Sequence, residues 1–206
     1  MKPITWRGAL LASLAAGLAM SPAQVRGQVS PRQLFEAGQY EEALAGFHER
    51  SESGEDPADT FMAVQALLKL DRGEQARQEL ERLRQREDVW ALVAQSAAAL
   101  MDDEKEKARE IAGRAVEAEP DQFFVRYQQG LAAAEGGEWQ TAAAAFERAT
   151  QIDPLFAYAH YYAGLSYSRI KRVDRTAAYF ERFLKLAPKA PERPAVESLM
   201  RTLRGR

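Results

Sequence analysis

The sequence predicts an all-α protein, built as a solenoid of antiparallel helix pairs with a capping helix at its C-terminal end. Three observations lead to this fold class. Pro120, Pro154 and Pro188 recur at a spacing of 34 residues, and self-similarity at such a period is typical of repeat architectures. A polar turn divides each repeat into two segments that carry apolar residues at helical spacing. Alanine is abundant and β-branched residues are sparse, which favours helix over sheet.

The period divides residues 31–188 into about five units. They span 31–56, 57–88, 89–122, 123–156 and 157–188. The first unit is short and degenerate, and Ser30 is the expected cap of its first helix. Proline ends the later units because it lacks an amide hydrogen and disfavours helix in the residue before it. In the second unit, Asp88 stands where that proline is expected.

Residues 189–206 are expected to form the capping helix. Their apolar side chains fall at i, i+3, i+4 and i+7, namely at Val196, Leu199, Met200 and Leu203. A solenoid exposes its last apolar face unless another element covers it. A capping helix is therefore the first interpretation, and a helix that docks on a partner or on a second copy is the alternative.

Small residues are expected to set the distance between the two helices of a pair. Side chains at a close helix crossing must be small, so Gly130 on the first helix is predicted to face Ala142 on the second. Trp139 and Phe146 are predicted to fill the wider space on either side. In the third unit, Ala112 replaces the aromatic residue, which predicts looser packing there.

The first 23 residues have the organisation of a secretory signal peptide. Two basic residues precede an apolar run of 13 residues, Gly8 to Met20, and small residues flank Pro22. We expect cleavage after Ala23 and a linker at residues 24–30; cleavage after Gly27 is the alternative. The apolar run is shorter than the roughly 20 residues of a membrane-spanning helix. We therefore expect an exported protein, periplasmic or extracellular, without a stable membrane span, and a retained anchor is the alternative.

Composition argues against several functions. The formal net charge is −2, whereas nucleic-acid binding needs clustered positive charge. The absence of cysteine excludes disulfides, thiol catalysis and cysteine-ligated metal sites. The two histidines, His48 and His160, lie in different units without a second nitrogen donor, so we expect no metal site. No catalytic triad or phosphate-binding loop is recognisable, and we expect no catalysis and no cofactor.

The order of small, aromatic and proline residues resembles the tetratricopeptide repeat family. In the fourth unit, Trp139, Ala142, Phe146 and Pro154 carry this pattern. The resemblance covers residues 31–188 and is strongest in the last two units. It implies a right-handed superhelix in which the first helix of each pair lines a concave groove that binds a protein or peptide.

The resemblance also indicates which side chains face this groove. In the third unit they are Trp90, Val93, Ala97, Leu100 and Met101. In the fourth they are Phe124, Tyr127, Leu131, Ala134 and Glu135, and in the fifth Tyr158, Tyr161, Leu165, Ser168 and Arg169. Aromatic side chains offer much contact area for little rotamer entropy, so we expect an apolar and aromatic contact with the partner. Packing between neighbouring units is the alternative for Tyr127 and Tyr161. The family's clamp for a C-terminal carboxylate uses lysine and asparagine. This chain has no asparagine, so an extended or helical apolar segment is the expected ligand.

These features together predict an exported scaffold or adaptor, within a bacterial envelope assembly, that binds a partner protein and has no catalytic activity. A structural subunit that self-associates into a homo-oligomer is the second hypothesis. A third hypothesis is an enzyme or small-ligand binder whose site has no recognisable sequence pattern.

Overall fold

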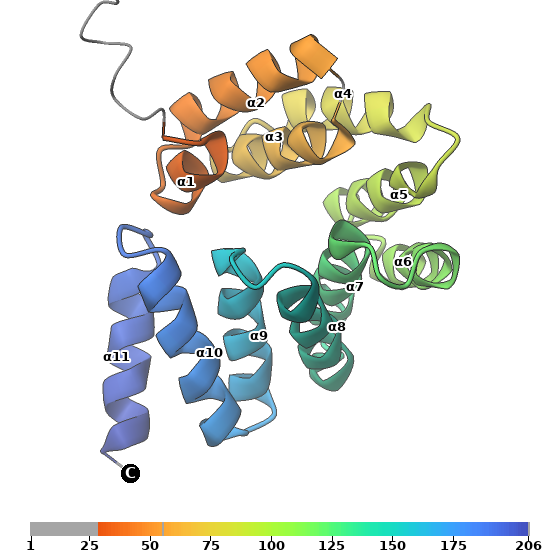
Figure 1. The fold of residues 1–206 in the computed structure, drawn as a ribbon. Helices are drawn as coiled ribbons and strands as arrows, with labels where there is room; N and C mark the ends of the chain where they lie inside the picture. Colours follow the sequence, from red (N-terminus) through yellow and green to blue (C-terminus); the bar gives the residue numbers. More distant parts are fainter. Residues whose placement is uncertain (1–28, 55, 206) are drawn as a thin grey trace, which may run out of the picture.

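The computed structural model describes residues 29–54 and 56–205. Within these ranges it contains eleven helices and no strand (Figure 1), so the predicted all-α fold is confirmed. The predicted signal peptide at residues 1–23 and most of the linker after it lie outside the described residues.

The helices form five consecutive pairs and a final helix. Their bounds are α1 (Pro31–Glu36), α2 (Tyr40–Gly54), α3 (Pro57–Lys69), α4 (Gly73–Arg84), α5 (Val89–Met101), α6 (Lys105–Ala118), α7 (Phe123–Glu135), α8 (Trp139–Ile152), α9 (Ala157–Arg169), α10 (Val173–Leu186) and α11 (Arg193–Arg204). The pairs are α1–α2, α3–α4, α5–α6, α7–α8 and α9–α10. The solenoid of helix pairs with a C-terminal helix therefore agrees with the predicted architecture.

Polar side chains fix the start of the first helix in four of the five pairs, with Gln122 in this place at α7. Ser30 forms a capping box at α1, and the side chain of Asp56 caps α3. At α5, the Asp88 carboxylate accepts a hydrogen bond from the amide of Trp90 at 3.1 Å. Asp88, which stands where later units have proline, thus begins the next pair by satisfying an amide that has no partner within its helix.

The turn inside each pair contains one residue in the left-handed backbone conformation. These residues are Gly38 (φ 78°), Asp71 (57°), Asp103 (58°), Gly137 (77°) and Lys171 (60°). Glycine adopts this conformation readily and aspartate tolerates it, whereas most residues with a Cβ atom avoid it. The repetition of this turn explains why pairs of different sequence form similar helical hairpins.

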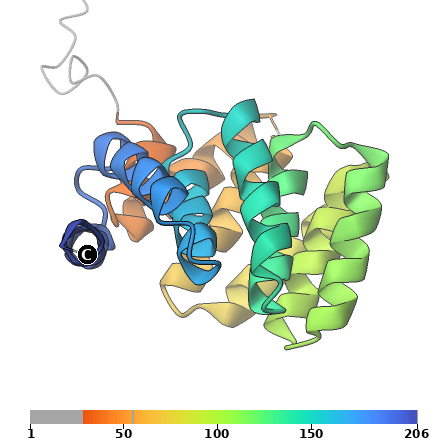
Figure 2. The ribbon, with the colours of Figure 1, turned by 90° about the horizontal axis from the view of Figure 1, so that it is seen from below.

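The pairs stack into a strongly curved arc. In Figure 1 the chain runs from α1–α4 through α5–α8 and returns with α9–α11 on the side of α1. Figure 2 shows α11 beside α10 at the end of the stack. Val196 and Met200 of α11 are buried in one cluster with Phe180 and Phe183 of α10. α11 therefore covers the last apolar face, as a capping helix does.

An aromatic ring lies over a glycine at the crossing of the last two pairs. A Cβ atom on Gly130 would lie 2.6 Å from the ring of Phe146, and one on Gly164 would lie 2.6 Å from the ring of Phe180. The prediction that Gly130 faces Ala142 is therefore wrong. The ring of Phe146 occupies the space that the missing side chain leaves.

The third pair replaces this ring contact with hydrogen bonds. Ser96 occupies the glycine position and Ala112 the aromatic position, and both are buried. The Ser96 hydroxyl donates to the carbonyl of Ala108 at 2.8 Å and accepts from the side-chain amide of Gln128 at 3.1 Å. In this pair the first helix carries the larger of the two residues, Ser96, and the second helix carries the smaller, Ala112. Hydrogen bonds therefore join the helices at this crossing instead of a ring contact.

Replacing Gly130 by alanine should lower the free energy of unfolding by about 1–3 kcal/mol, the usual effect of overpacking. The reason is that the added methyl group would lie 2.6 Å from the Phe146 ring. Gly113→Ala is the matched control, because a Cβ atom on Gly113 meets nothing within 4 Å and alanine favours helix. Urea denaturation of both variants measures the difference. Equal stability of the two variants would contradict the close crossing.

Candidate functional site

The residues predicted to line the groove differ widely in exposure. Trp90, Tyr127 and Tyr158 are buried, with 8%, 3% and 1% of their surface exposed. Phe124, Leu131, Tyr161 and Leu165 are half-buried, and Arg169 is exposed. The structure brings Trp90 next to Phe124, with ring centroids 5.3 Å apart, and Tyr158 next to Tyr161, 5.9 Å apart. Arg169 lies apart from them, with its guanidinium 5.2 Å from the ring centroid of Trp139.

Aromatic rings from alternate pairs meet across the concave face. The ring centroid of Phe61 on α3 lies 5.4 Å from that of Phe124 on α7 and 6.2 Å from that of Trp90 on α5. Phe124 and Trp90 are themselves 5.3 Å apart. The expectation that Trp90 offers its ring to a partner does not fit its burial here, because the curvature of the arc brings Phe61 over it.

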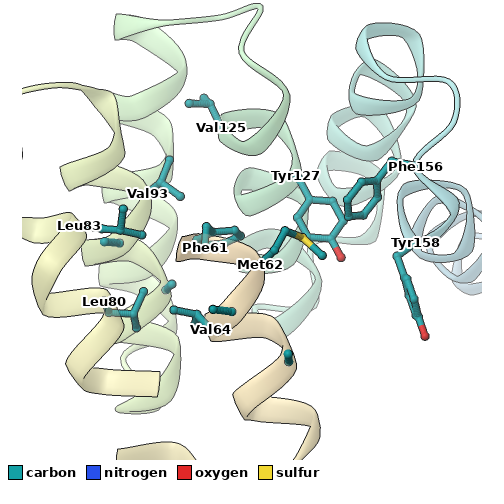
Figure 3. Packing of buried hydrophobic residues seen from close by; sticks show 14 of the residues in the cluster. Phe61, Met62, Val64, Leu80, Leu83, Val93, Val125, Tyr127, Phe156 and Tyr158 are labelled. Atoms are coloured by element: carbon teal, nitrogen blue, oxygen red, sulfur yellow. The ribbon is translucent and has the colours of Figure 1, made fainter. Parts of the chain in front are cut away.

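Tyr127 packs between neighbouring pairs. Its ring lies 5.7 Å from Phe146, 5.9 Å from Tyr162 and 5.3 Å from Phe156, which is shown next to it in Figure 3. Burial raises the pKa of the Tyr127 hydroxyl well above its usual value. Tyr127 thus occupies the place that the packing alternative assigned to it, as an uncharged core residue.

Helix α1 closes the arc by docking on the start of α9. The Glu36 carboxylate accepts a hydrogen bond from the amide of Ala157 at 3.0 Å. The ring of Phe35 packs edge-on against Tyr158, with centroids 5.3 Å apart. The start of α9 has no side-chain cap of its own, so Glu36, 121 residues away in sequence, supplies one. We call these contacts, together with those of Arg32 and Glu192, the closure.

Arg32 forms the charged part of the closure. Its guanidinium lies 2.8 Å from the Asp153 carboxylate and 4.5 Å from the ring centroid of Phe156. Arg32 and Asp153 are 32% and 31% exposed, and such pairs contribute at most about 1 kcal/mol. An edge-to-face ring pair adds about 0.5–1.5 kcal/mol. The closure is therefore specific in geometry but modest in energy.

Glu192, just before α11, joins a second set of closure contacts. It lies 3.0 Å from the ammonium group of Lys69 on α3 and accepts a hydrogen bond from the Tyr158 hydroxyl at 2.8 Å. Burial raises the pKa of that hydroxyl, so it remains a donor. Next to Glu192, Pro191 lies against the turn at Gly38, where a Cβ atom would be 2.5 Å from the proline Cγ. Pro191 and Glu192 lie outside the five repeat units, so the repeat pattern gave no signal by which to find these contacts.

The other half of the concave face is open. A depression of about 410 Å³ lies between the C-terminal halves of α3, α5 and α7 and the middle of α9. Its lining residues are Gln65, Leu68, Lys69, Ala97, Leu100, Met101, Gln128, Leu131, Glu135 and Tyr162. Five of these residues belong to the predicted groove set, namely Ala97, Leu100, Met101, Leu131 and Glu135. Leu68, 42% exposed, is a large apolar side chain that the predicted set lacked. We call this region the open groove.

The described residues hold no recognisable metal centre or membrane-spanning helix. In this part of the chain, no group of three or more histidine, cysteine, aspartate and glutamate residues could hold a metal ion. His48 instead pairs with Glu79 at 3.1 Å, and a ring nitrogen of His160 lies 3.0 Å from the carbonyl oxygen of Pro154. Among the described helices, none combines the length and apolar character needed to cross a bilayer.

Glu36→Gln should stabilise the protein at neutral pH. Burial raises the pKa of Glu36 above its usual 4.5, although Arg32 and the Ala157 amide oppose this shift. A raised pKa means that the stability contribution of this group is full below pH 4.5 and is lost as the pH rises through the pKa of the folded state. Glutamine keeps the acceptor for the Ala157 amide and removes the buried charge. Thermal unfolding should therefore give a higher Tm for the variant at pH 7, and the difference should shrink toward pH 4. A variant less stable at pH 7 would contradict this balance.

A family model identifies the last two repeats. The tetratricopeptide repeat family model matches residues 124–155 and 158–190, which make up most of the last two pairs. A comparison with curated proteins finds no match.

Solved structures with the same fold are distant in sequence. TTC0263, a thermophilic tetratricopeptide repeat (TPR) protein of Thermus thermophilus, is 20% identical with a TM-score of 0.58, over 84% of this chain and 94% of that one. YrrB, described as a TPR protein with an unusual peptide-binding site, is 20% identical with a TM-score of 0.52, over 82% and 88%. The first TPR of Spaghetti (RPAP3), bound to the HSP90 peptide SRMEEVD, is 14% identical with a TM-score of 0.52, over 57% and 91%. Residues 124–155 and 158–190 thus match the tetratricopeptide repeat family model, and the chain shares the fold of solved TPR proteins.

Proposed function

We propose that this protein is an exported scaffold that binds a segment of a partner protein in the open groove and has no catalytic activity of its own. The observation that carries the proposal is the open groove itself, where four helices present apolar side chains around a depression of about 410 Å³. Exposed apolar surface in a concave site is characteristic of a binding surface.

The lining of the open groove suits an apolar side chain of a partner. Leu68, Leu100, Met101 and Leu131 surround it, and methionine adapts its shape to different ligands. Lys69 and Glu135 add a charge of each sign to the lining. Because Lys69 is paired with Glu192, the Glu135 carboxylate is the charge left for a partner. An apolar segment with a neighbouring basic residue fits this arrangement.

Peptide binding by structural neighbours supports the same proposal by analogy. YrrB is described as having a peptide-binding site, and the first TPR of Spaghetti (RPAP3) was solved with a bound peptide. At 20% and 14% identity these structures share the fold, and the transfer of peptide binding to this chain is our proposal.

A self-associating structural subunit is the second candidate. In this chain α11 buries Val196 and Met200 at the end of the solenoid, which removes the apolar end face that such a subunit could use. We therefore favour the scaffold. A mass that rises with concentration in light scattering would favour the subunit instead.

Leu68→Glu should abolish partner capture without loss of helix content. The substitution places a charge in the open groove at a side chain that is 42% exposed, so the fold should tolerate it. Leu155→Glu is the matched control, because Leu155 is 62% exposed and lies outside the open groove. A photo-crosslinking residue at Met101, in cells that produce the protein, measures capture in each background. Equal crosslinked products in both variants would refute the groove assignment.

Export should be directed by the first residues. Fusing residues 1–30 to a reporter enzyme that is active only outside the cytoplasm should give reporter activity, and the same fusion with Lys2 and Arg7 replaced by glutamate should give much less. N-terminal sequencing of the mature protein is expected to start at Gln24. A mature protein that still begins at Met1 would instead indicate a retained anchor.

A further inference from the structure

Helix α1 occupies a site at the junction of the fourth and fifth pairs whose groups are all present without it. The site consists of the Asp153 carboxylate, the Phe156 ring, the uncapped amide of Ala157 and the Tyr158 ring, and we call it the α1 site. Each part meets one group of α1, which is a cation, a carboxylate or an aromatic ring. The start of a helix attracts negative charge, and here Glu36 provides it.

Several features indicate that α1 can leave this site. α1 has six residues, far fewer than the about 12–15 that an isolated helix needs. A hollow of about 350 Å³ remains where α1 faces the turn between α10 and α11, lined by Gln33, Glu36, Leu186 and Lys189 among others. Glu36 is 7% exposed. Its raised pKa indicates that the free-energy cost of burying the carboxylate exceeds the stabilisation that Arg32 and the Ala157 amide provide. A contact selected for stability alone would not bury this charge.

We propose that α1 is an internal stand-in for a partner segment that binds the α1 site, and that such a partner displaces α1. This inference rests on the proposed function, partner binding, and adds the chemistry of the partner and the means by which access is controlled. The partner presents a basic residue, a large apolar or aromatic residue three positions later, and an acidic residue directly after it, as Arg32, Phe35 and Glu36 do.

Displacement of α1 also uncovers the aromatic part of the concave face. Phe35 covers Tyr158, and Lys69 and Tyr158 share the Glu192 carboxylate. A partner must therefore compete with a segment of the same chain, which lowers its apparent affinity by the fraction of molecules in which α1 is undocked. The predicted groove residue Tyr158, 1% exposed with α1 docked, loses the cover of Phe35 only in that fraction.

A tethering experiment on the full chain tests the proposal. A Cβ atom on Gly38 would lie 4.0 Å from the Cβ atom of Pro191, a separation typical of disulfides, and the chain has no cysteine of its own. The probe is a synthetic peptide of residues 29–40 with the G38C substitution. It is incubated in a thiol–disulfide buffer with full chains that carry P191C, either alone or with R32A and F35A. The yield of the mixed disulfide is measured by mass spectrometry.

The proposal predicts at least tenfold more mixed disulfide between the peptide and the P191C/R32A/F35A chain than between the peptide and the chain with P191C alone. The reason is that α1 of the R32A/F35A chain no longer competes with the peptide. The same peptide with F35A should give at least tenfold less product, and so should adding D153A to the chain. Because F35A removes a buried ring, the chain with R32A alone is a second background, and far-UV circular dichroism checks helix content in both.

Two results would overturn the proposal. Equal yields for the two peptides on folded R32A/F35A and R32A chains would mean that the α1 site does not recognise this chemistry. Disulfide-linked dimers between G38C chains and P191C chains would assign the site to α1 of a second copy. Neither result depends on the open groove, so crosslinking at Met101 can still succeed when tethering fails, and the two proposals can be judged separately.

Discussion

The close approach of the two helices within each pair is the constraint on which the rest of the structure depends. At Gly130 and Gly164 a ring occupies the space of the missing side chain, and at Ser96 a hydroxyl joins the two helices instead. Each crossing fixes the shape of one hairpin, and each hairpin can then stack on the next in the same way. The curvature of the arc builds up as these hairpins stack one on the next (Figure 1).

That curvature decides what the concave face can do. It is strong enough for Phe61 to reach Phe124 two pairs away and for Glu36 to cap α9. One half of the face is therefore filled by rings of the chain itself, and the other half remains as the open groove. A scaffold with this division presents one surface at all times and a second surface only after α1 has moved.

The sequence predicted the local structure well because local structure depends on neighbouring residues. The spacing of the prolines located the pairs, and the apolar stripe at Val196 and Met200 located α11. The contacts of Trp90 and Tyr158 could not be predicted in the same way, because they depend on a rotation accumulated over several pairs. Arg32 and Glu192 belong to no repeat position. Arg32 pairs with Asp153, 121 residues away, and Glu192 pairs with Lys69, 123 residues away. The residues that recur along the chain could be predicted from the sequence, whereas the residues that join its two ends could not.

The closure changes how the two ends of the molecule should lose structure. In an open solenoid each repeat contacts only its neighbours, so the terminal repeats fray first and unfolding spreads inward. Here the short first helix is held by residues of the fifth pair, and the fifth pair is held in return. Fraying at either terminus therefore breaks contacts at both, so the loss of structure at one end is coupled to the other.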